Sequence, residues 1–363
     1  MRRVIAAARA WPYTFAVGLS LVVGATAIYY SRSLGIGLKD PEGFLGPAYI
    51  RLPLIALLIF AAGIVPQSLH RYGVKEFVPG LKIILKEEWS LSRVGHVATG
   101  MLAFYICYVS YRNLKSYLPE LRQDASGAQV LYDTEMLRLD HWLFFGNRPP
   151  QVLHDLLGTT ITAQVLAILY VLYLPIVPIT VGAVLVLVRD RTVGAWYATA
   201  VSLNWVLGVV SYYLIPTLGP AFVQPASYED LSTNGASALQ QSLFVSATRF
   251  YDDPGGGAIY GIAGFASLHV SVVFTAALFL HLAGAPRWLR IIAWTYLGTT
   301  VLATLYLGWH YVADDVGGLF IGWAAVAIGA FVTGNTRPQR ARRRESSEAL
   351  AAPSPEDAAT TSG

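Results

Sequence analysis

The chain has 363 residues, of which 55% are hydrophobic and only 13% are charged, and its formal net charge is +4. Soluble domains usually carry about 25% charged residues, so this composition argues against a soluble globular protein and indicates one embedded in a lipid bilayer. The single cysteine, Cys107, excludes an intrachain disulfide framework and a cysteine-based metal site. We expect no nucleic-acid partner.

Apolar runs of about 17 residues or more, long enough to cross a bilayer, recur along the whole sequence. They predict an all-α, polytopic membrane bundle with about eight transmembrane helices, at residues 13–30, 48–66, 96–111, 160–188, 194–215, 265–283, 290–308 and 311–333. The first run could instead be a cleaved signal peptide. It exceeds the usual apolar region of about 7–15 residues and lacks a small-x-small cleavage site, which favours a retained anchor.

The segments between these runs differ in character. Residues 67–95 are amphipathic and are expected to form a helix on the inner leaflet. Residues 112–159 and 216–264 are long, and the stretch LDHWLFFGNRPPQVLHDLLG in the first is expected to lie as a helix on the outer interface. The tail after Arg337, rich in arginine and then in Ser, Ala, Pro and Glu, is predicted to be disordered and solvated.

The distribution of positive charge predicts the orientation. If the N-terminus is cytoplasmic, the cytoplasmic segments hold 17 of the 26 lysine and arginine residues. This excess favours cytoplasmic N- and C-termini, with the reversed topology as the alternative. The two long segments then lie outside, which indicates an outward-facing working surface.

Two clusters of polar residues coincide with predicted helix starts, and ionisable groups at membrane depth are candidates for function. One reads ASLH over residues 266–269, and the other reads GWHYVADD over residues 308–315. His310 and Asp314 are four residues apart, so on a helix they share a face and can hydrogen-bond. A carboxylate on one imidazole nitrogen leaves the other free to attack, and His269 could protonate a leaving oxygen. The plainer interpretation is that His310 and Asp314 cap a helix and that His269 is an interfacial polar residue.

The order and spacing of these clusters resemble the type 2 phosphatidic-acid phosphatase superfamily. Its second motif is Pro-Ser-Gly-His, where residues 266–269 read ASLH, and its third is Ser-Arg-x5-His-x3-Asp, where residues 303–314 read ATLYLGWHYVAD. The histidines and the aspartate match, but the Ser-Arg pair does not. The first motif, Lys-x6-Arg-Pro, is also absent in strict form, although His141 lies seven residues before Arg148-Pro149.

The departures resemble the inositol phosphorylceramide synthase-like branch of that superfamily, as do the stretches YRNLK at residues 111–115 and LFFG at residues 143–146. The resemblance covers roughly residues 97–333. It divides the chain into two N-terminal helices with the amphipathic segment (1–95), a six-helix core (96–334) and a tail (335–363).

The resemblance implies transfer of phosphoinositol, or a similar headgroup, from a phospholipid to a lipid hydroxyl through a phosphohistidine. His310 would be the nucleophile, Asp314 its orienting acid and His269 the general acid, with Ser267 contacting the substrate. The missing motif arginine requires other cations for the phosphate, and the candidates are Lys115, Arg148 and Arg249. Metal-independent chemistry is implied, so we expect no metal and no cofactor, although the acidic pairs at 252–253 and 314–315 leave a metal site open.

Two other functions compete with this one. A lipid or polyprenyl phosphate phosphatase would use the same site with water as the acceptor. A membrane transporter would use the buried histidines and aspartate as a proton relay. Transporters often show inverted repeats and place such charges near the membrane midplane. No internal repeat is visible in the sequence, and the charges lie at predicted helix ends.

Overall fold

The computed structural model describes residues 11–40, 42–43, 46–337 and 339. The arginines at positions 2, 3, 9, 340 and 342–344, which are counted above as cytoplasmic, lie outside the described residues. So does most of the tail that is predicted to be disordered. The helices with their bounds are α2 Thr14–Leu34, α3 Ala48–Tyr72, α4 Phe77–Glu88, α5 Leu91–Ser116, α6 Leu118–Leu121, α7 Asp133–Leu143, α8 Pro149–Leu157, α9 Ile161–Leu187, α10 Arg191–Leu214, α11 Pro220–Val223, η1 Pro225–Tyr228, α12 Gly235–Asp252, α13 Leu268–Leu282, α14 Arg287–Tyr306 and α15 Val312–Val332. A minimal hairpin, β1 Glu42–Gly43 and β2 Gly46–Pro47, precedes α3.

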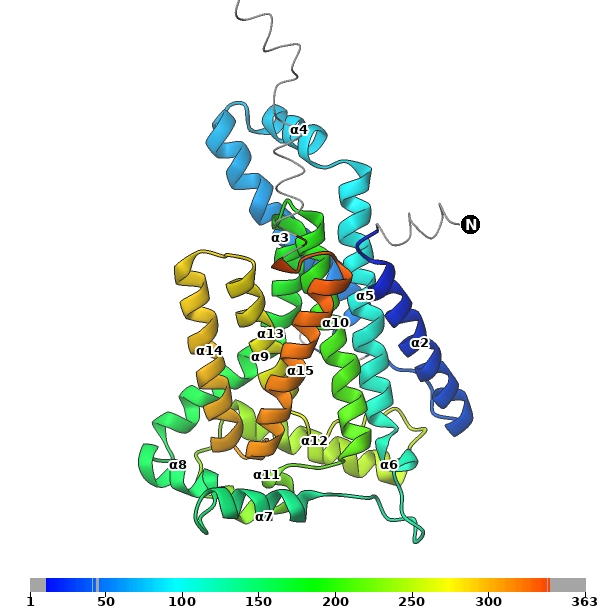
Figure 1. Ribbon diagram of the computed structural model, residues 1–363, viewed down its shortest axis with the longest axis vertical. Coiled ribbons are helices and arrows are strands. Elements are labelled where there is room, and N and C mark those ends of the chain that lie inside the picture. Colours follow the sequence, from blue (N-terminus) through cyan, green and yellow to red (C-terminus); the bar gives the residue numbers. More distant parts are fainter. Residues whose placement is uncertain (1–10, 41, 44–45, 338, 340–363) are drawn as a thin grey trace, which may run out of the picture.

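Each of the eight predicted transmembrane runs coincides with a helix, and the chain is a polytopic helical membrane protein. Among the described residues, six helices are long and apolar enough to cross a membrane: α2, α3, α5, α9, α10 and α15. The other two, α13 and α14, pack against each other, and α13 also packs against α15 in the same bundle (Figure 1). At 15 residues, α13 is shorter than a typical span.

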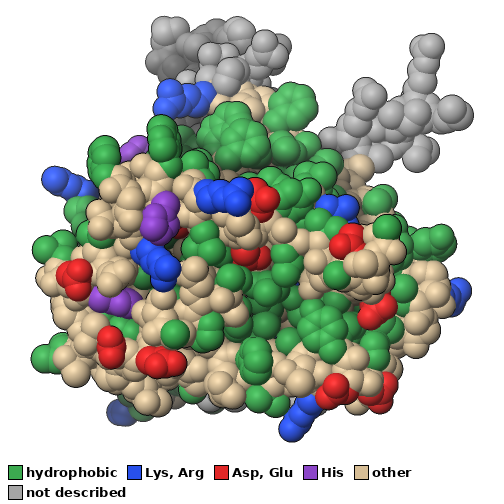
Figure 2. All heavy atoms as spheres, turned by 90° about the horizontal axis from the view of Figure 1, so that it is seen from below, with side chains coloured by type: hydrophobic (Ala, Val, Ile, Leu, Met, Phe, Trp, Pro, Cys, Tyr) green, Lys and Arg blue, Asp and Glu red, His purple; other side chains and the backbone are tan. Residues whose placement is uncertain are grey.

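The two ends of the bundle differ. The helices α7, α8, α11 and α12 lie across one end, which we call the capped end, and α4 lies at the opposite end (Figure 1). Seen from outside, the capped end shows acidic, basic and histidine side chains around exposed hydrophobic ones (Figure 2). The stretch predicted as one interfacial helix forms two, α7 and α8. Phe145 and Gly146 take positive φ angles between them, and two prolines at 149–150 start α8.

Helix α10 is the centre of the bundle and packs against α5, α9, α13 and α15. Small residues on it allow close approach, as is common between membrane helices. Polar contacts fix the pairing: Asn204 of α10 donates to Thr275 of α13 at 2.9 Å and accepts from Ser271. The start of α13 approaches α15 closely at Gly318, where an added Cβ would lie 2.4 Å from the carbonyl oxygen of Ser267, the N-cap residue of α13.

Candidate active site

His310 lies in the turn between α14 and α15. Asp314, in the first turn of α15, accepts a hydrogen bond from the backbone N–H of Tyr311 at 3.0 Å, and its Oδ2 lies 3.3 Å from Nδ1 of His310. The carboxyl group therefore holds both the turn and the ring. With Nδ1 engaged in this way, Nε2 is the nitrogen left for a substrate.

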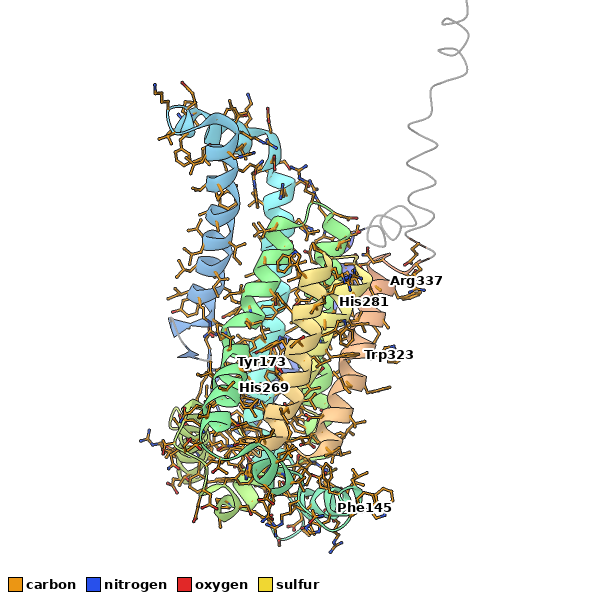
Figure 3. The ribbon with its side chains drawn as sticks, turned by 90° about the vertical axis from the view of Figure 1, so that its left-hand side faces the viewer. Phe145, Tyr173, His269, His281, Trp323 and Arg337 are labelled. Atoms are coloured by element: carbon orange, nitrogen blue, oxygen red, sulfur yellow. The ribbon has the colours of Figure 1, made fainter. Side chains whose placement is uncertain are left out.

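His269 lies in the first turn of α13, which begins after Ser267. The Ser267 hydroxyl caps this helix by accepting from the N–H of Val270 at 3.4 Å. The ring of His269 stacks on that of Tyr170 of α9 at 4.2 Å, and its Nδ1 lies 3.3 Å from the Tyr170 hydroxyl. Its Nε2 is buried and has no hydrogen-bond partner among the described residues. Figure 3 shows His269 beside Tyr173 inside the bundle.

The two histidines come together because the starts of their helices are tied. The backbone N–H of Ser267 donates to the carbonyl oxygen of Asp314 at 2.9 Å. The rings of His269 and His310 have centroids 6.1 Å apart. Two imidazoles from segments 41 positions apart in the sequence thus border one space, an arrangement that can bind a reacting group between them.

That space is a cavity of about 160 Å³. Its walls are mostly aromatic and aliphatic, and its polar contributions are His269, His310, Lys115 and Arg112, besides several tyrosines. The ammonium of Lys115, a residue only 6% exposed, donates to the carbonyl oxygen of Gly261 at 2.7 Å. It also lies 5.6 Å from the ring centroid of Tyr111 and 5.8 Å from that of Tyr212. The cavity therefore combines two imidazoles with two cations.

Sequence reasoning did not select Arg112. It precedes Lys115 by three positions, so both side chains occupy one face of α5, and the Nε of Arg112 is buried without a hydrogen-bond partner among the described residues. The sequence did contain a signal for Arg112, because two cations at i, i+3 spacing at the end of an apolar run point to the same side of a helix.

The other predicted phosphate-binding residues do not line the histidine cavity. Arg148 donates to Ser227 at 2.9 Å and lines a separate cavity of about 350 Å³, whose walls come mainly from α7, α8 and η1. Arg249 is exposed on α12. Ser267 is fully buried, where its hydroxyl caps α13. Among the predicted cations, the structure brings only Lys115 to the histidines.

The position of the missing motif arginine is occupied by Thr304 of α14. Its hydroxyl donates to Oδ2 of Asp315 at 2.8 Å, and both residues are buried. A hydroxyl–carboxyl pair offers no positive charge to a phosphate at this position. The charge in the cavity comes instead from α5.

Two acidic residues of α7, which sequence reasoning also missed, clamp the turn that carries His310. Asp133 accepts from the backbone N–H groups of Leu218 and Gly219 at 3.0 Å and from the Tyr311 hydroxyl at 2.8 Å. Asp140 accepts from the N–H of Val312 at 3.2 Å, and burial raises the pKa of Asp140 to about 7. The sequence signal for this pair was the spacing of seven residues, which puts both carboxylates on the same face of an amphipathic helix.

Within the part of the chain that the structure describes, no group of three His, Cys, Asp or Glu side chains is placed to hold a metal ion. The two residues of the acidic pair at 314–315 contact different side chains: Asp314 contacts His310, and Asp315 contacts Thr304.

Comparison with known proteins gave one match. A family model described as the PAP2 superfamily matches residues 134–328. The matched segment includes both histidines and Asp314, whereas Arg112 and Lys115 precede it. Neither the curated proteins nor the solved structures gave a match.

Proposed function

Because the chain belongs to the PAP2 superfamily, which supports a membrane phosphatase or phosphotransferase acting on lipid phosphates, we propose that it transfers a phospho-headgroup from a phospholipid to a lipid hydroxyl. Membership makes the chain an enzyme of the phosphatase or phosphotransferase type. The finer assignment, transfer of a phosphoinositol-type group through a phosphohistidine, follows the resemblance to the inositol phosphorylceramide synthase-like branch.

The observation that carries the proposal is the pair of differently held imidazoles over one cavity. His310 has its Nδ1 beside a carboxylate, as a nucleophile requires. His269 has an unpartnered Nε2 and a tyrosine hydroxyl at Nδ1, which suits a group that exchanges a proton with the substrate. Lys115 and Arg112 line the same cavity and balance the phosphate charge.

In the first half of the reaction, Nε2 of His310 attacks phosphorus, a P–N bond forms and the P–O bond to diacylglycerol breaks. His269 gives its proton to the departing alkoxide, and Asp314 stabilises the positive charge on the substituted ring. In the second half, the acceptor hydroxyl gives its proton to His269 and attacks phosphorus. The P–N bond then breaks and His310 is regenerated. Two displacements of this kind replace one harder direct transfer.

The test uses the purified protein, phosphatidylinositol labelled at phosphorus and a lipid with a free hydroxyl. Rapid quenching followed by alkaline electrophoresis should show labelled protein, because phosphohistidine survives alkali. Label should then move to the second lipid. His310→Ala should abolish both labelling and transfer, whereas the exposed imidazole of His141 on α7 provides a matched control, His141→Ala, that keeps both. Label released only to water would favour the phosphatase, and persistent labelling in His310→Ala would contradict the assigned nucleophile.

We also propose that the capped end, and with it the site, faces outward, as the charge distribution predicts. A cysteine at Ser242 on α12 should react with an impermeant thiol reagent applied to intact cells, and a cysteine at Lys75 near α4 should not. The native Cys107 is buried and gives no background. The opposite pattern would reverse the orientation and place the site on the cytoplasmic face.

A further inference from the structure

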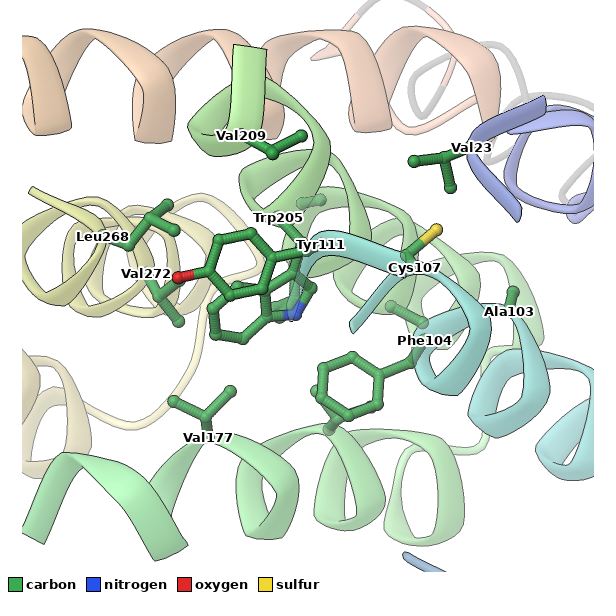
Figure 4. Packing of buried hydrophobic residues seen from close by; sticks show 14 of the residues in the cluster. Val23, Ala103, Phe104, Cys107, Tyr111, Val177, Trp205, Val209, Leu268 and Val272 are labelled. Carbon is green, nitrogen blue, oxygen red and sulfur yellow. The ribbon is translucent and has the colours of Figure 1, made fainter. Parts of the chain in front are cut away.

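Two further spaces lie near the histidine cavity, a small cavity next to it and a large groove next to the small cavity. The small cavity, of about 50 Å³, shares four lining residues with the histidine cavity, Tyr108, Tyr173, Leu174 and Trp205. The large groove of about 690 Å³, lined by α3, α4 and α5, shares Leu52 with the small cavity. Figure 4 shows the packing between α5, α9 and α10 around Phe104, Val177 and Trp205, which line the small cavity. The small cavity therefore lies between the groove at α3 and the histidine cavity, and it shares lining residues with each of them.

The small cavity contains one charged residue, Arg51 of α3. Its Nε is buried without a hydrogen-bond partner among the described residues, and the rest of the side chain is partly exposed. An arginine in a membrane-spanning helix is energetically unfavourable unless it finds water or an anion, so it is a candidate for function. Arg51 can meet this requirement with a ligand.

The depth of Arg51 argues against a simple interfacial role. Asp40 accepts from the N–H groups of Ala48 and Tyr49, at 3.0 and 3.2 Å, and from the hydroxyl of Tyr105 at 3.0 Å. Since Tyr105 lies near the middle of α5, helix α3 begins beside the middle of that helix rather than at its end. Asp40 is already occupied by these three donors, and it forms no ion pair with Arg51.

The large groove supplies the second feature. Its lining is almost wholly apolar, with Leu57, Phe60 and Met101 among its side chains, and it opens between the helices that precede the matched family segment. Arg51 lines the small cavity and not the groove itself, and the two spaces share Leu52. A phospholipid fits this pair of spaces with its acyl chains in the groove and its phosphate at the guanidinium. Arginine is well suited to bind phosphate oxygens through paired N–H donors.

We propose that Arg51 and the groove between α3, α4 and α5 form an intramembrane binding site for one anionic phospholipid, from which the phosphate passes to Lys115 and Arg112 in the histidine cavity. This site rests on the proposed function for its role in catalysis. Its ligand chemistry, a phosphate monoanion with acyl chains, rests on the cavity and its unpartnered cation. Helices α3, α4 and α5 thereby contribute substrate capture to a site whose histidines lie on α13 and beside α15.

The test separates binding from catalysis. In the inactive His310→Ala protein, dissolved in non-ionic detergent, retention of dioleoyl phosphatidylinositol is measured by native mass spectrometry, with dioleoyl glycerol as the uncharged control. Adding Arg51→Gln should weaken retention of phosphatidylinositol about tenfold to a hundredfold and leave that of the uncharged lipid unchanged. Arg51→Lys should restore part of the binding. Arg138→Gln, which removes an exposed arginine on α7, should change neither.

In the otherwise native protein, Arg51→Gln should raise KM for the long-chain donor and leave kcat nearly unchanged, because the residue does not touch the reacting atoms. Equal retention of phosphatidylinositol with and without Arg51 would overturn the proposal, and so would an equal loss of both lipids. If Arg51-dependent retention is found in a protein that transfers no phosphorus, the proposed function fails while this binding site stands.

Discussion

Replacing Asp314 by asparagine removes the negative charge beside His310 and keeps the size of the side chain. The structure sets the scale of the expected loss. With Oδ2 of Asp314 at 3.3 Å from Nδ1 of His310 and an effective dielectric constant of about 20, the charge stabilises the imidazolium by about 5 kcal/mol. At about 1.4 kcal/mol per tenfold change in rate, this corresponds to a loss of about 10³–10⁴ in the rate of enzyme phosphorylation. An asparagine NH₂ can also favour the tautomer in which Nε2 carries the proton and cannot attack.

The assay is a single-turnover experiment with labelled donor, which follows the formation of labelled protein. Oδ2 of Asp314 takes both the contact with His310 and the hydrogen bond from the N–H of Tyr311, so an asparagine that turns its NH₂ towards His310 loses the bond from Tyr311. We therefore expect a modest fall in the melting temperature of Asp314→Asn and little change in its KM. Asp155→Asn, at an exposed carboxylate of α8, is the matched control and should label at the native rate. A phosphorylation rate for Asp314→Asn within tenfold of the native rate, in a folded protein, would refute the reasoning.

Three further predictions follow from the site and the bundle. Lys115→Ala should lower turnover by about one to three orders of magnitude, because its charge lines the histidine cavity, whereas Arg249→Ala should leave it unchanged; equal effects would contradict this choice of cation. Gly318→Val should destabilise the protein by about 1–3 kcal/mol through a clash with the backbone of α13, and Gly298→Ala, with nothing within 4 Å, should be neutral or stabilising; thermal unfolding tests both. Because burial raises the pKa of Asp140 to about 7, the folded protein keeps a proton that the unfolded chain loses near pH 4, so this group lowers stability as pH rises from about 4 to 7. Asp140→Asn should flatten that part of the profile of melting temperature against pH, and an unchanged slope would count against a shifted Asp140.

The sequence alone determined the helical, membrane-embedded character of the chain. In a bilayer, the backbone polar groups of an apolar run can be satisfied only within a helix or a closed barrel, so run length translates directly into helices. Each of the eight predicted runs coincides with a helix. The contact between His310 and Asp314 was also accessible, because the two residues belong to one local segment, although His310 lies in the turn before α15 and not on the helix itself.

The tertiary structure alone decided what surrounds that pair. His269 reaches His310 only because α13 and α15 approach closely at Gly318 and share the hydrogen bond between Ser267 and Asp314. No local pattern encodes that approach, since it depends on side chains far apart in the sequence.

The choice among cations was likewise beyond local reasoning. Lys115, Arg148 and Arg249 all looked like charges near the outer face, and their sequence positions did not rank them. Helix α5 turns Lys115 and Arg112 into the cavity, whereas α12 leaves Arg249 in solvent. The same holds for Arg51, whose significance depends on where α3 begins along α5. The position of a charge along a membrane helix sets its desolvation, but its partners are set by which other helices pack around it.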